Sequence, residues 1–438
     1  MKKNIVKPSI LPGFMELLPA DQIKFNILAD TIRDTYESFG FMPIDTPVIE
    51  KSEILLAKGG GETEKQIYRF TKGSNDLSLR FDLTVPLARY VAQNYSSLTF
   101  PFRRYQIGKV YRGERNQKGR FREFYQCDID IVGNNSLSIF SDAEIPSIIY
   151  KIFNNLGFKN FTIKVNNRKL LNGFFESLEI QDKAEVLRII DKIDKIGKAS
   201  AIEEFLSSGL NSKVVEQIFE FINLSGSNQE ILLLLQTLNI CNTNFQEGLE
   251  ELSIVSKYVE LFGVPQENFK IDLKISRGLD YYTGTVYETF LNEYPSIGSV
   301  CSGGRYDNLA EYYTKQKLPG VGISIGLTRL FYQLNEVGFF NNNSTSITKA
   351  IVIPLDNNNL DYGISIANDL RTKGVITEIY LEDSKLVKKL NYTNKLGIPF
   401  AILIGDTETE NKTATIKKME TGEQVIVDFN EVYEIVTT

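Results

Sequence analysis

The sequence predicts an α+β protein of several domains, and three observations support this prediction. The chain has 438 residues, a length that favours two or three domains over one. A strand-like, aromatic-rich region from about 78 to 133 is followed by a long stretch of amphipathic helices, after which strand character returns. Beyond residue 346 strand and helix patterns alternate, which is typical of a separate α/β domain.

The N-terminal part begins with a helix and continues into strands. Apolar residues recur at helical spacing over 22–39, and Gly40 follows as a stop signal. Segment 41–50 has β-branched residues but also Pro43 and Pro47, so it suits an edge or interface strand. The strand-like region after it ends at the turn signal Asn134-Asn135.

The later part of the chain divides into three. Amphipathic helices predict a helical insertion over 166–263, which separates a first sheet-bearing part (1–165) from a second (264–340). A helix begins near Gly326, and 341–346 is a polar linker. Strand and helix patterns over 347–438 predict a small α/β domain with parallel strand pairing.

Composition excludes several kinds of chemistry. The chain contains no histidine, which rules out imidazole bases, Ser-His-Asp and Cys-His nucleophile systems, and every metal site that uses histidine. Three dispersed cysteines cannot make a disulfide framework or a four-thiolate zinc site, so we expect no metal centre and a cytoplasmic location. No apolar run approaches the roughly 20 residues that cross a bilayer, and we expect no membrane partner.

A basic cluster stands out in this acidic chain, whose net charge is −6. Eight cations lie between Arg103 and Glu123, against only two anions: Arg103, Arg104, Lys109, Arg112, Arg115, Lys118, Arg120 and Arg122. Arginine presents planar paired donors to phosphate, so the cluster indicates a polyphosphate or nucleic-acid site. A solvated charged hairpin explains the charge equally well.

The strand after this cluster sorts its residues by face. Side chains alternate along a strand, so one face carries Phe124, Gln126, Asp128 and Asp130, and the other carries Tyr125, Cys127, Ile129 and Ile131. A face with an aromatic, an amide and carboxylates could stack a base and hold a cationic ligand. The alternative is an exposed sheet face, which ordinarily carries Thr, Lys and Glu.

Four further segments combine polar residues with glycine or proline. Arg80, Asp82 and Thr84 share one side of a possible strand, although Asp or Thr before Pro86 is also an ordinary helix cap. Glycines in 277–284 and 302–307 allow a ligand close to the backbone. In 320–329 a strand, Gly326 and a helix carrying Arg329 form a candidate anion site. The sequence has neither a Walker loop nor a dinucleotide-binding fingerprint.

Taken in order, these segments resemble the class II aminoacyl-tRNA synthetases, and within them the histidyl-tRNA synthetase family. The class motifs are matched by 39–47, by 111–126 and by Gly326-Leu-Thr-Arg329, and the two family signatures by Arg277-Gly-Leu-Asp-Tyr-Tyr282 and Gly303-Gly-Arg-Tyr-Asp307. The resemblance covers nearly the whole chain. It implies an antiparallel-sheet catalytic domain with the helical insertion, and a C-terminal α/β domain that binds the anticodon.

The resemblance also implies roles for individual residues. Those expected to bind L-histidine are Asp82, Thr84, Gln126, Asp130, Tyr281 and Tyr282, with the imidazole between Asp130 and Tyr282. Those expected to bind ATP, with Mg²⁺ carried on it, are Arg112, Glu114, Arg120, Phe124, Arg277 and Arg329. The expected catalytic residues are Arg112, Gln126 and Arg277, whose positioning and charge supply the acceleration without any protein imidazole.

The implied activity is ligation of histidine to tRNA(His) by a homodimer. Arg115 and Gln117 are the candidates for contact with the tRNA acceptor end. Lysines over 385–395 could meet tRNA phosphates, or could simply form a solvated helix face. Two other readings remain: a non-catalytic histidine-sensing paralog, such as the regulatory subunit of ATP phosphoribosyltransferase, and a tRNA-binding scaffold without adenylation.

Overall fold

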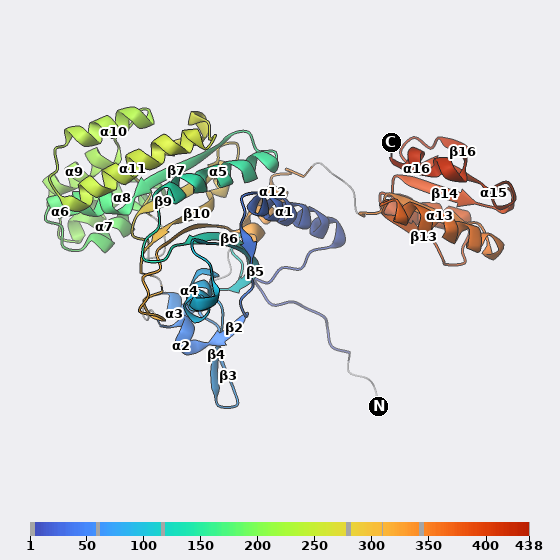
Figure 1. Ribbon diagram of the computed structural model, residues 1–438, viewed down its shortest axis with the longest axis horizontal. Helices are drawn as coiled ribbons and strands as arrows, with labels where there is room; N and C mark the ends of the chain where they lie inside the picture. The colour runs from blue at the N-terminus through green and yellow to red at the C-terminus, as the bar shows by residue number, and fades with distance from the viewer. Residues whose placement is uncertain are drawn as a thin grey trace. The chain divides into compact units, whose positions relative to one another are not determined.

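The computed structural model describes residues 5–57, 62–114, 119–276, 282–308, 310–340 and 346–437. The chain divides into two compact units, one built mainly from 28–337 and the other mainly from 338 onward. Each unit has its own sheet, shown in Figure 1. The predicted α+β class, with a helical insertion and a C-terminal α/β part, is confirmed.

An eight-stranded sheet forms the centre of the larger unit. Its strands, in spatial order, are β1 (Met42–Pro43), β5 (Phe102–Tyr111), β6 (Glu123–Val132), β11 (Gly320–Ile325), β10 (Ser299–Tyr306), β9 (Thr285–Leu291), β7 (Phe161–Asn167) and β8 (Phe269–Ile271). The pairing is antiparallel except at the two edges, β1–β5 and β7–β8. The proline-containing segment 41–50 therefore contributes an edge strand, as its sequence predicts.

Helices cover one face of this sheet. They include α1 (Pro19–Ser38), which is the helix predicted over 22–39, α5 (Phe140–Asn155) and α12 (Leu327–Glu336). Tyr36 of α1 is completely buried and donates its hydroxyl proton to the carbonyl of Cys127 on β6. Because β6 alternates its side chains, this contact fixes the apolar face of the strand against the helices and turns the polar face the other way.

Smaller elements border the opposite face. A short sheet is formed by β2 (Ile49–Lys51), β4 (Asn75–Leu79) and β3 (Arg69–Lys72), with helices α2 (Ser52–Leu55), α3 (Glu62–Gln66) and α4 (Thr84–Gln93) nearby. Leu87 and Val91 of α4 pack with Phe102, Val132 and Tyr306 in one buried cluster. This cluster anchors the start of α4 beside the polar face of the large sheet.

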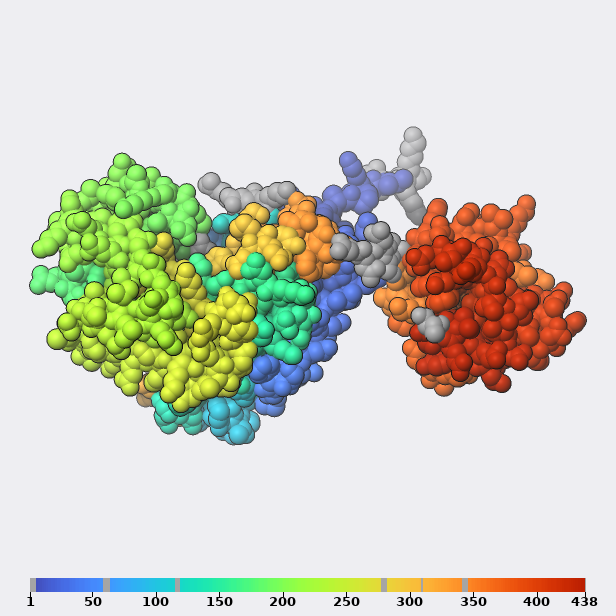
Figure 2. All heavy atoms as spheres, turned by 90° about the horizontal axis from the view of Figure 1, so that it is seen from above, coloured from blue at the N-terminus to red at the C-terminus, as the bar shows by residue number. Residues whose placement is uncertain are grey.

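The helical insertion runs between β7 and β8. Its helices are α6 (Arg168–Ser177), α7 (Lys183–Ile190), α8 (Ile193–Ser207), α9 (Ser212–Ile222), α10 (Asn228–Thr237) and α11 (Thr243–Leu261). All of these helices except α8 have a side-chain cap at the N-terminus; for example, Asn211 caps α9, and Ser227 with Glu230 forms a capping box on α10. Figure 2 shows the insertion as a compact green-to-yellow body, and α11 contacts both α5 and β7.

The smaller unit has a five-stranded sheet. The order is β13 (Thr377–Ile379), β12 (Ala350–Pro354), β14 (Phe400–Ile404), β15 (Thr413–Lys418) and β16 (Gln424–Asp428), with helices α13 (Leu360–Thr372), α14 (Leu386–Lys395), α15 (Asp406–Asn411) and α16 (Val432–Thr437). The predicted parallel pairing is confirmed for β13, β12 and β14, whereas β15 and β16 are antiparallel. No helix separates β15 from β16, so the chain returns directly and the pair must be antiparallel.

Candidate functional site

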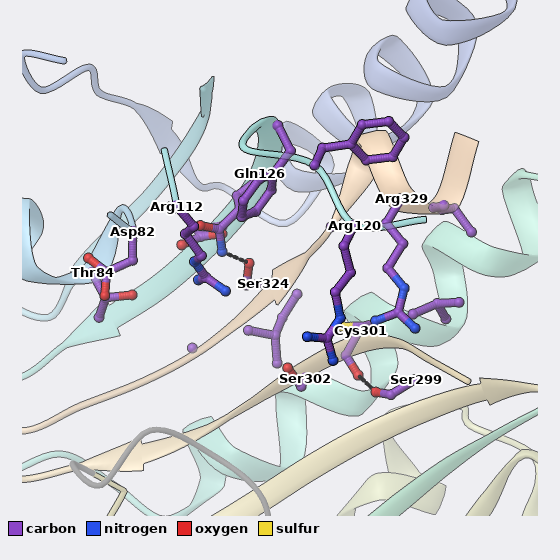
Figure 3. Close-up of a pocket in the computed structure, with 18 of the residues that line it drawn as sticks. Asp82, Thr84, Arg112, Arg120, Gln126, Ser299, Cys301, Ser302, Ser324 and Arg329 are labelled. Carbon is purple, nitrogen blue, oxygen red and sulfur yellow. Dashed lines mark hydrogen bonds between the residues drawn. The ribbon is translucent and has the colours of Figure 1, made fainter. Parts of the chain in front are cut away.

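The polar face of the large sheet forms the floor of a pocket of about 410 Å³. Phe124, Gln126, Asp128 and Asp130 of β6 all line it, as the alternation along this strand predicts. The neighbouring strands β11 and β10 contribute Ser324 and Ser302, and α12 contributes Arg329 (Figure 3). Residues far apart in the sequence therefore meet in one pocket.

One end of the pocket is acidic and buried. Asp82, Asp128 and Asp130 are each no more than 4% exposed. Burial is the main reason why the pKa of Asp128 rises to about 7 and that of Asp130 to about 6; it also raises the pKa of Asp82. Arg104 lies beneath them, fully buried and ion-paired with Asp130, and opposes these shifts. Three carboxylates share one buried cation, so this end is suited to a cationic ligand.

Asp82 has two roles at the start of α4. Its Oδ1 accepts a 3.0 Å hydrogen bond from the amide of Val85, which caps the helix, and its side chain also lines the pocket beside Thr84. The two readings of the sequence, cap and ligand group, are therefore compatible. The expectation of one strand face carrying Arg80, Asp82 and Thr84 was wrong: β4 ends at Leu79, and the buried Arg80 donates from Nε to the carbonyl of Lys109.

A tyrosine that the sequence reasoning did not single out completes the acidic end. Tyr306 donates its hydroxyl proton to Asp130 Oδ1 at 2.9 Å, and both residues line the pocket. Tyr282 lines the same pocket. Segment 302–307 was predicted as a ligand site because of its glycines. Alternation along a strand places Ser302, Gly304 and Tyr306 on one face, and this pattern would have identified Tyr306 as a pocket residue.

Glycines on β11 make room for this arrangement. A Cβ on Gly322 would lie 2.3 Å from Asp130 Oδ1 and from the backbone oxygen of Ile129. A Cβ on Gly320 would lie 2.4 Å from the ring of Tyr306. Since β11 runs between β6 and β10, only the absence of side chains at these positions lets Tyr306 reach across to Asp130.

The other end of the pocket is rich in arginine. Arg120 and Arg329 line this end (Figure 3). Arg112 lies nearer the acidic end: its guanidinium is 4.4 and 5.1 Å from the ring centres of Phe81 and Phe124, and its charge opposes the rise that burial causes in the pKa of Asp82. Arg329 Nη2 donates to the carbonyl of Ile297 at 3.1 Å. These side chains, together with the first turn of α12, provide donors and positive charge for a phosphate chain.

Among the described residues, one carboxylate lies at this arginine-rich end. Glu114 lines the pocket, and its Oε2 lies 3.4 Å from Arg120 Nη1. Across the described ranges no group of three potential ligands is arranged to hold a metal ion.

Four predicted site residues, Arg115, Gln117, Arg277 and Tyr281, lie outside the described residues.

The lysines over 385–395, on and just before α14, belong to the smaller unit and differ in their exposure to solvent. Lys385, Lys388 and Lys395 are exposed. Lys389 is 4% exposed and donates from Nζ to the carbonyl of Pro354, so it is not available for phosphate contact. Within the described parts of the chain, no helix is both long and apolar enough to span a membrane.

Comparison with known proteins gives one consistent result. The family model described as histidyl-tRNA synthetase matches residues 13–330, and the anticodon binding domain model matches 349–438. Histidine--tRNA ligase of Clostridium tetani (strain Massachusetts / E88) is 63% identical over 437 residues, covering 100% of this chain and 99% of that protein. Histidyl-tRNA synthetase from Nostoc sp. PCC 7120 has a crystal structure that is 40% identical with a TM-score of 0.92, covering 100% and 99% of the two chains.

One solved structure bears on the regulatory alternative. It is described as an ATP phosphoribosyltransferase regulatory subunit/histidyl-tRNA synthetase from Bacillus halodurans C, and it is 20% identical with a TM-score of 0.74 over 88% of this chain and 97% of its own. Such a likeness shows the shared fold alone. With family matches along its whole length, this chain belongs to the histidyl-tRNA synthetase family.

Proposed function

We propose that this chain activates L-histidine with ATP and then transfers the histidyl group to tRNA(His). The observation that carries the proposal is the division of one pocket into a buried carboxylate end and an arginine end. An amino acid with a cationic ammonium and a polar ring suits the first, and a nucleoside triphosphate suits the second. Their junction is where an amino acid carboxylate would meet an α-phosphate.

The acidic end would bind the amino acid. Asp82, Thr84 and Gln126 would hold its ammonium group, while Asp130 and Tyr282 would each partner one imidazole nitrogen beside Tyr281. Buried polar groups left unpaired by an apolar side chain would penalise the wrong substrate strongly. The hydrogen bond from Tyr306 to Asp130 supports this assignment because it keeps one carboxylate oxygen fixed.

The arginine end would bind ATP. Phe124 would stack the adenine, Arg120 and Arg329 would contact the outer phosphates, and Arg112 with Arg277 would contact the reacting groups. Mg²⁺ prefers oxygen ligands and commonly takes one or two carboxylates together with substrate phosphates. Glu114 is the carboxylate at this end, which fits a Mg²⁺ carried with ATP that neutralises phosphate charge.

The chemistry would take two steps. A carboxylate oxygen of histidine attacks the α-phosphorus as the bond to the bridging oxygen breaks and pyrophosphate leaves. The terminal ribose hydroxyl of tRNA then attacks the acyl carbon and releases its proton, while the bond between the acyl carbon and the phosphate oxygen breaks and AMP leaves with the electron pair. Gln126 would fix the attacking substrate, while Arg112 and Arg277 would stabilise the charge that develops on phosphorus oxygens.

The remaining partners are part of the same proposal. Arg115 and Gln117 would contact the acceptor end of tRNA, and the smaller unit would contact the anticodon. A homodimer is supported by exposed apolar residues in segment 41–50, where Met42 on edge strand β1 is 54% exposed and Ile49 at the start of β2 is 48% exposed. The three cysteines are all free, which supports a cytoplasmic location.

The decisive experiment is exchange of labelled pyrophosphate into ATP with each amino acid in turn, followed by charging of tRNA. Histidine alone should support both reactions. A histidine-sensing paralog and a tRNA-binding scaffold would both give no exchange. The absence of histidine-dependent exchange would therefore overturn the proposal. Light scattering on the purified chain tests the proposed homodimer separately. A molar mass equal to that of one chain would contradict the homodimer.

A further inference from the structure

Asp128 and Ser324 form a pair that no proposed substrate contact explains. Ser324 on β11 lies directly opposite Asp128 on the antiparallel strand β6, and Gln126 lies two residues away on the same face. Gln126 Nε2 is 2.6 Å from Ser324 Oγ, the contact drawn as a dashed line in Figure 3. Burial raises the pKa of Asp128 to about 7, and the facing Ser324 hydroxyl acts against this rise, as a donor to the carboxylate would.

The chemistry of these three groups sets the direction of the hydrogen bonds. An ionised carboxylate only accepts, and a hydroxyl has a single proton to give. Ser324 therefore donates to Asp128 and must accept from Gln126, which requires the NH₂ group of the amide to face Ser324. The carbonyl oxygen of Gln126 is then directed away from Ser324.

This orientation leaves two buried acceptors at the pocket. Gln126 Oε1 and Asp128 Oδ1 are both buried and have no hydrogen-bond partner among the described residues. Gln126 is 8% exposed and Asp128 2% exposed, and both line the pocket. An unpaired buried acceptor is unfavourable, and a ligand that brings several N–H donors removes that cost. A primary ammonium, with three donors and a positive charge, would satisfy the outward-facing Gln126 Oε1.

We propose that Asp128 and Ser324 are positioning residues for Gln126: their hydrogen-bond chain holds the amide with its carbonyl toward the pocket, where it accepts a hydrogen bond from the ammonium of the amino acid substrate. The proposal deepens the proposed function and rests on it. Loss of the Asp128 charge frees the Ser324 proton to bond Gln126 Oε1. The amide then turns and presents NH₂, a donor, to the ammonium.

The test uses Asp128→Asn, Ser324→Ala and the double variant in histidine-dependent pyrophosphate exchange at pH 7.5. Each single change should raise the KM for histidine about 10- to 50-fold, as expected for a hydrogen bond to a charged group, with the KM for ATP within about twofold. The double variant should be no worse than the worse single variant, because both changes break one chain.

A desamino analogue separates positioning from general damage to the pocket. Imidazolepropionate lacks the ammonium, so its inhibition constant should remain within about twofold of wild type in every variant. Ser147→Ala, which removes another buried serine hydroxyl on α5, should leave both constants unchanged. Ser324→Ala tests the proposal by itself even where Asp128→Asn fails to fold.

Three results would overturn the inference: a wild-type KM in Ser324→Ala, effects that multiply in the double variant, or an inhibition constant that rises in parallel with the KM for histidine. Failure of the proposed function has a different signature. A wild-type chain without histidine-dependent exchange overturns both, whereas an active wild type with a silent Ser324→Ala overturns the positioning chain alone.

Discussion

Tyr306 and Asp130 come from strands that are not neighbours in the sheet, yet the tyrosine hydroxyl donates a 2.9 Å hydrogen bond to Asp130 Oδ1. The strand between them, β11, has glycine where its side chains would block the contact. Tyr306 opposes the rise that burial causes in the pKa of Asp130, because its hydrogen bond favours the ionised carboxylate. Asp130 is thereby held in place and kept more acidic at the base of the pocket.

Tyr306→Phe should weaken histidine binding. Without the hydroxyl, the pKa of Asp130 rises further above 6 and Oδ1 loses its hydrogen bond, while the ion pair with Arg104 remains. A hydrogen bond to a charged group contributes about 1.5–3 kcal/mol, so the KM for histidine should rise about 10-fold or more. Tyr313→Phe removes another hydroxyl, bonded to the carbonyl of Ile54, and serves as the control. Equal KM values in the two variants would contradict the role of Tyr306.

Gly322→Ala should damage the acidic end more than its single methyl group suggests. The new Cβ would lie 2.3 Å from Asp130 Oδ1 and from a backbone oxygen, which cannot move without displacing β6. Overpacking of this kind costs about 1–3 kcal/mol, and kcat/KM for histidine should fall at least 10-fold. Ile325→Val perturbs the same strand outside the pocket lining and should retain activity. Wild-type kinetics in Gly322→Ala would disprove the tight fit.

Arg329→Ala should affect ATP rather than histidine. The guanidinium enters the pocket from the first turn of α12, where helix N-terminus and charge both favour phosphate. We expect the KM for ATP in pyrophosphate exchange to rise about 10- to 100-fold, as for loss of a charge-assisted hydrogen bond. Arg33→Ala, on the exposed side of α1, is the matched control. A larger change for histidine than for ATP would reverse the assignment of the two ends.

Asp128→Asn should change how stability depends on pH. Burial raises the pKa of Asp128 to about 7, so between about pH 4 and 7 the folded protein holds a proton that the unfolded chain has released. The bound proton contributes fully to the free energy of unfolding below about pH 4. This contribution decreases as the pH rises and is lost once the pH passes 7, a change of about 4 kcal/mol at most. Without substrate, the melting temperature of the variant relative to that of the wild type should therefore increase from pH 5 to 8. Parallel curves would show that Asp128 does not titrate in this range.

Lys389→Ala should destabilise the smaller unit. Lys389 is buried, donates to the carbonyl of Pro354 at 2.7 Å and lies 5.6 Å from the centre of the Tyr380 ring. We expect a loss of about 2 kcal/mol, visible as a lower melting temperature. Lys388→Ala, an exposed position on the same helix, should change stability by less than about 0.5 kcal/mol. Equal melting of the two variants would contradict a structural role for Lys389.

Local patterns made much of the architecture predictable. The helix over 22–39, the edge strand with two prolines and the parallel strands of the smaller unit were all recognised, because periodicity and backbone-restricting residues act within a few positions. The antiparallel β15–β16 pair was not predicted, and neither was the end of β4 before Arg80. Both depend on which partner strand supplies hydrogen bonds, a choice that local sequence does not determine.

Strand alternation needs no knowledge of neighbouring strands, so the residue order alone predicts that Phe124, Gln126, Asp128 and Asp130 share one face of β6. The partners of those side chains could not be predicted in this way. Arg104 beneath the carboxylates, Tyr306 reaching across two glycines, and Ser324 between Gln126 and Asp128 are all contacts across strands. Strand register brings together residues up to nearly 200 positions apart, and burial then sets their protonation and hydrogen bonding, so both effects arise only in the folded sheet.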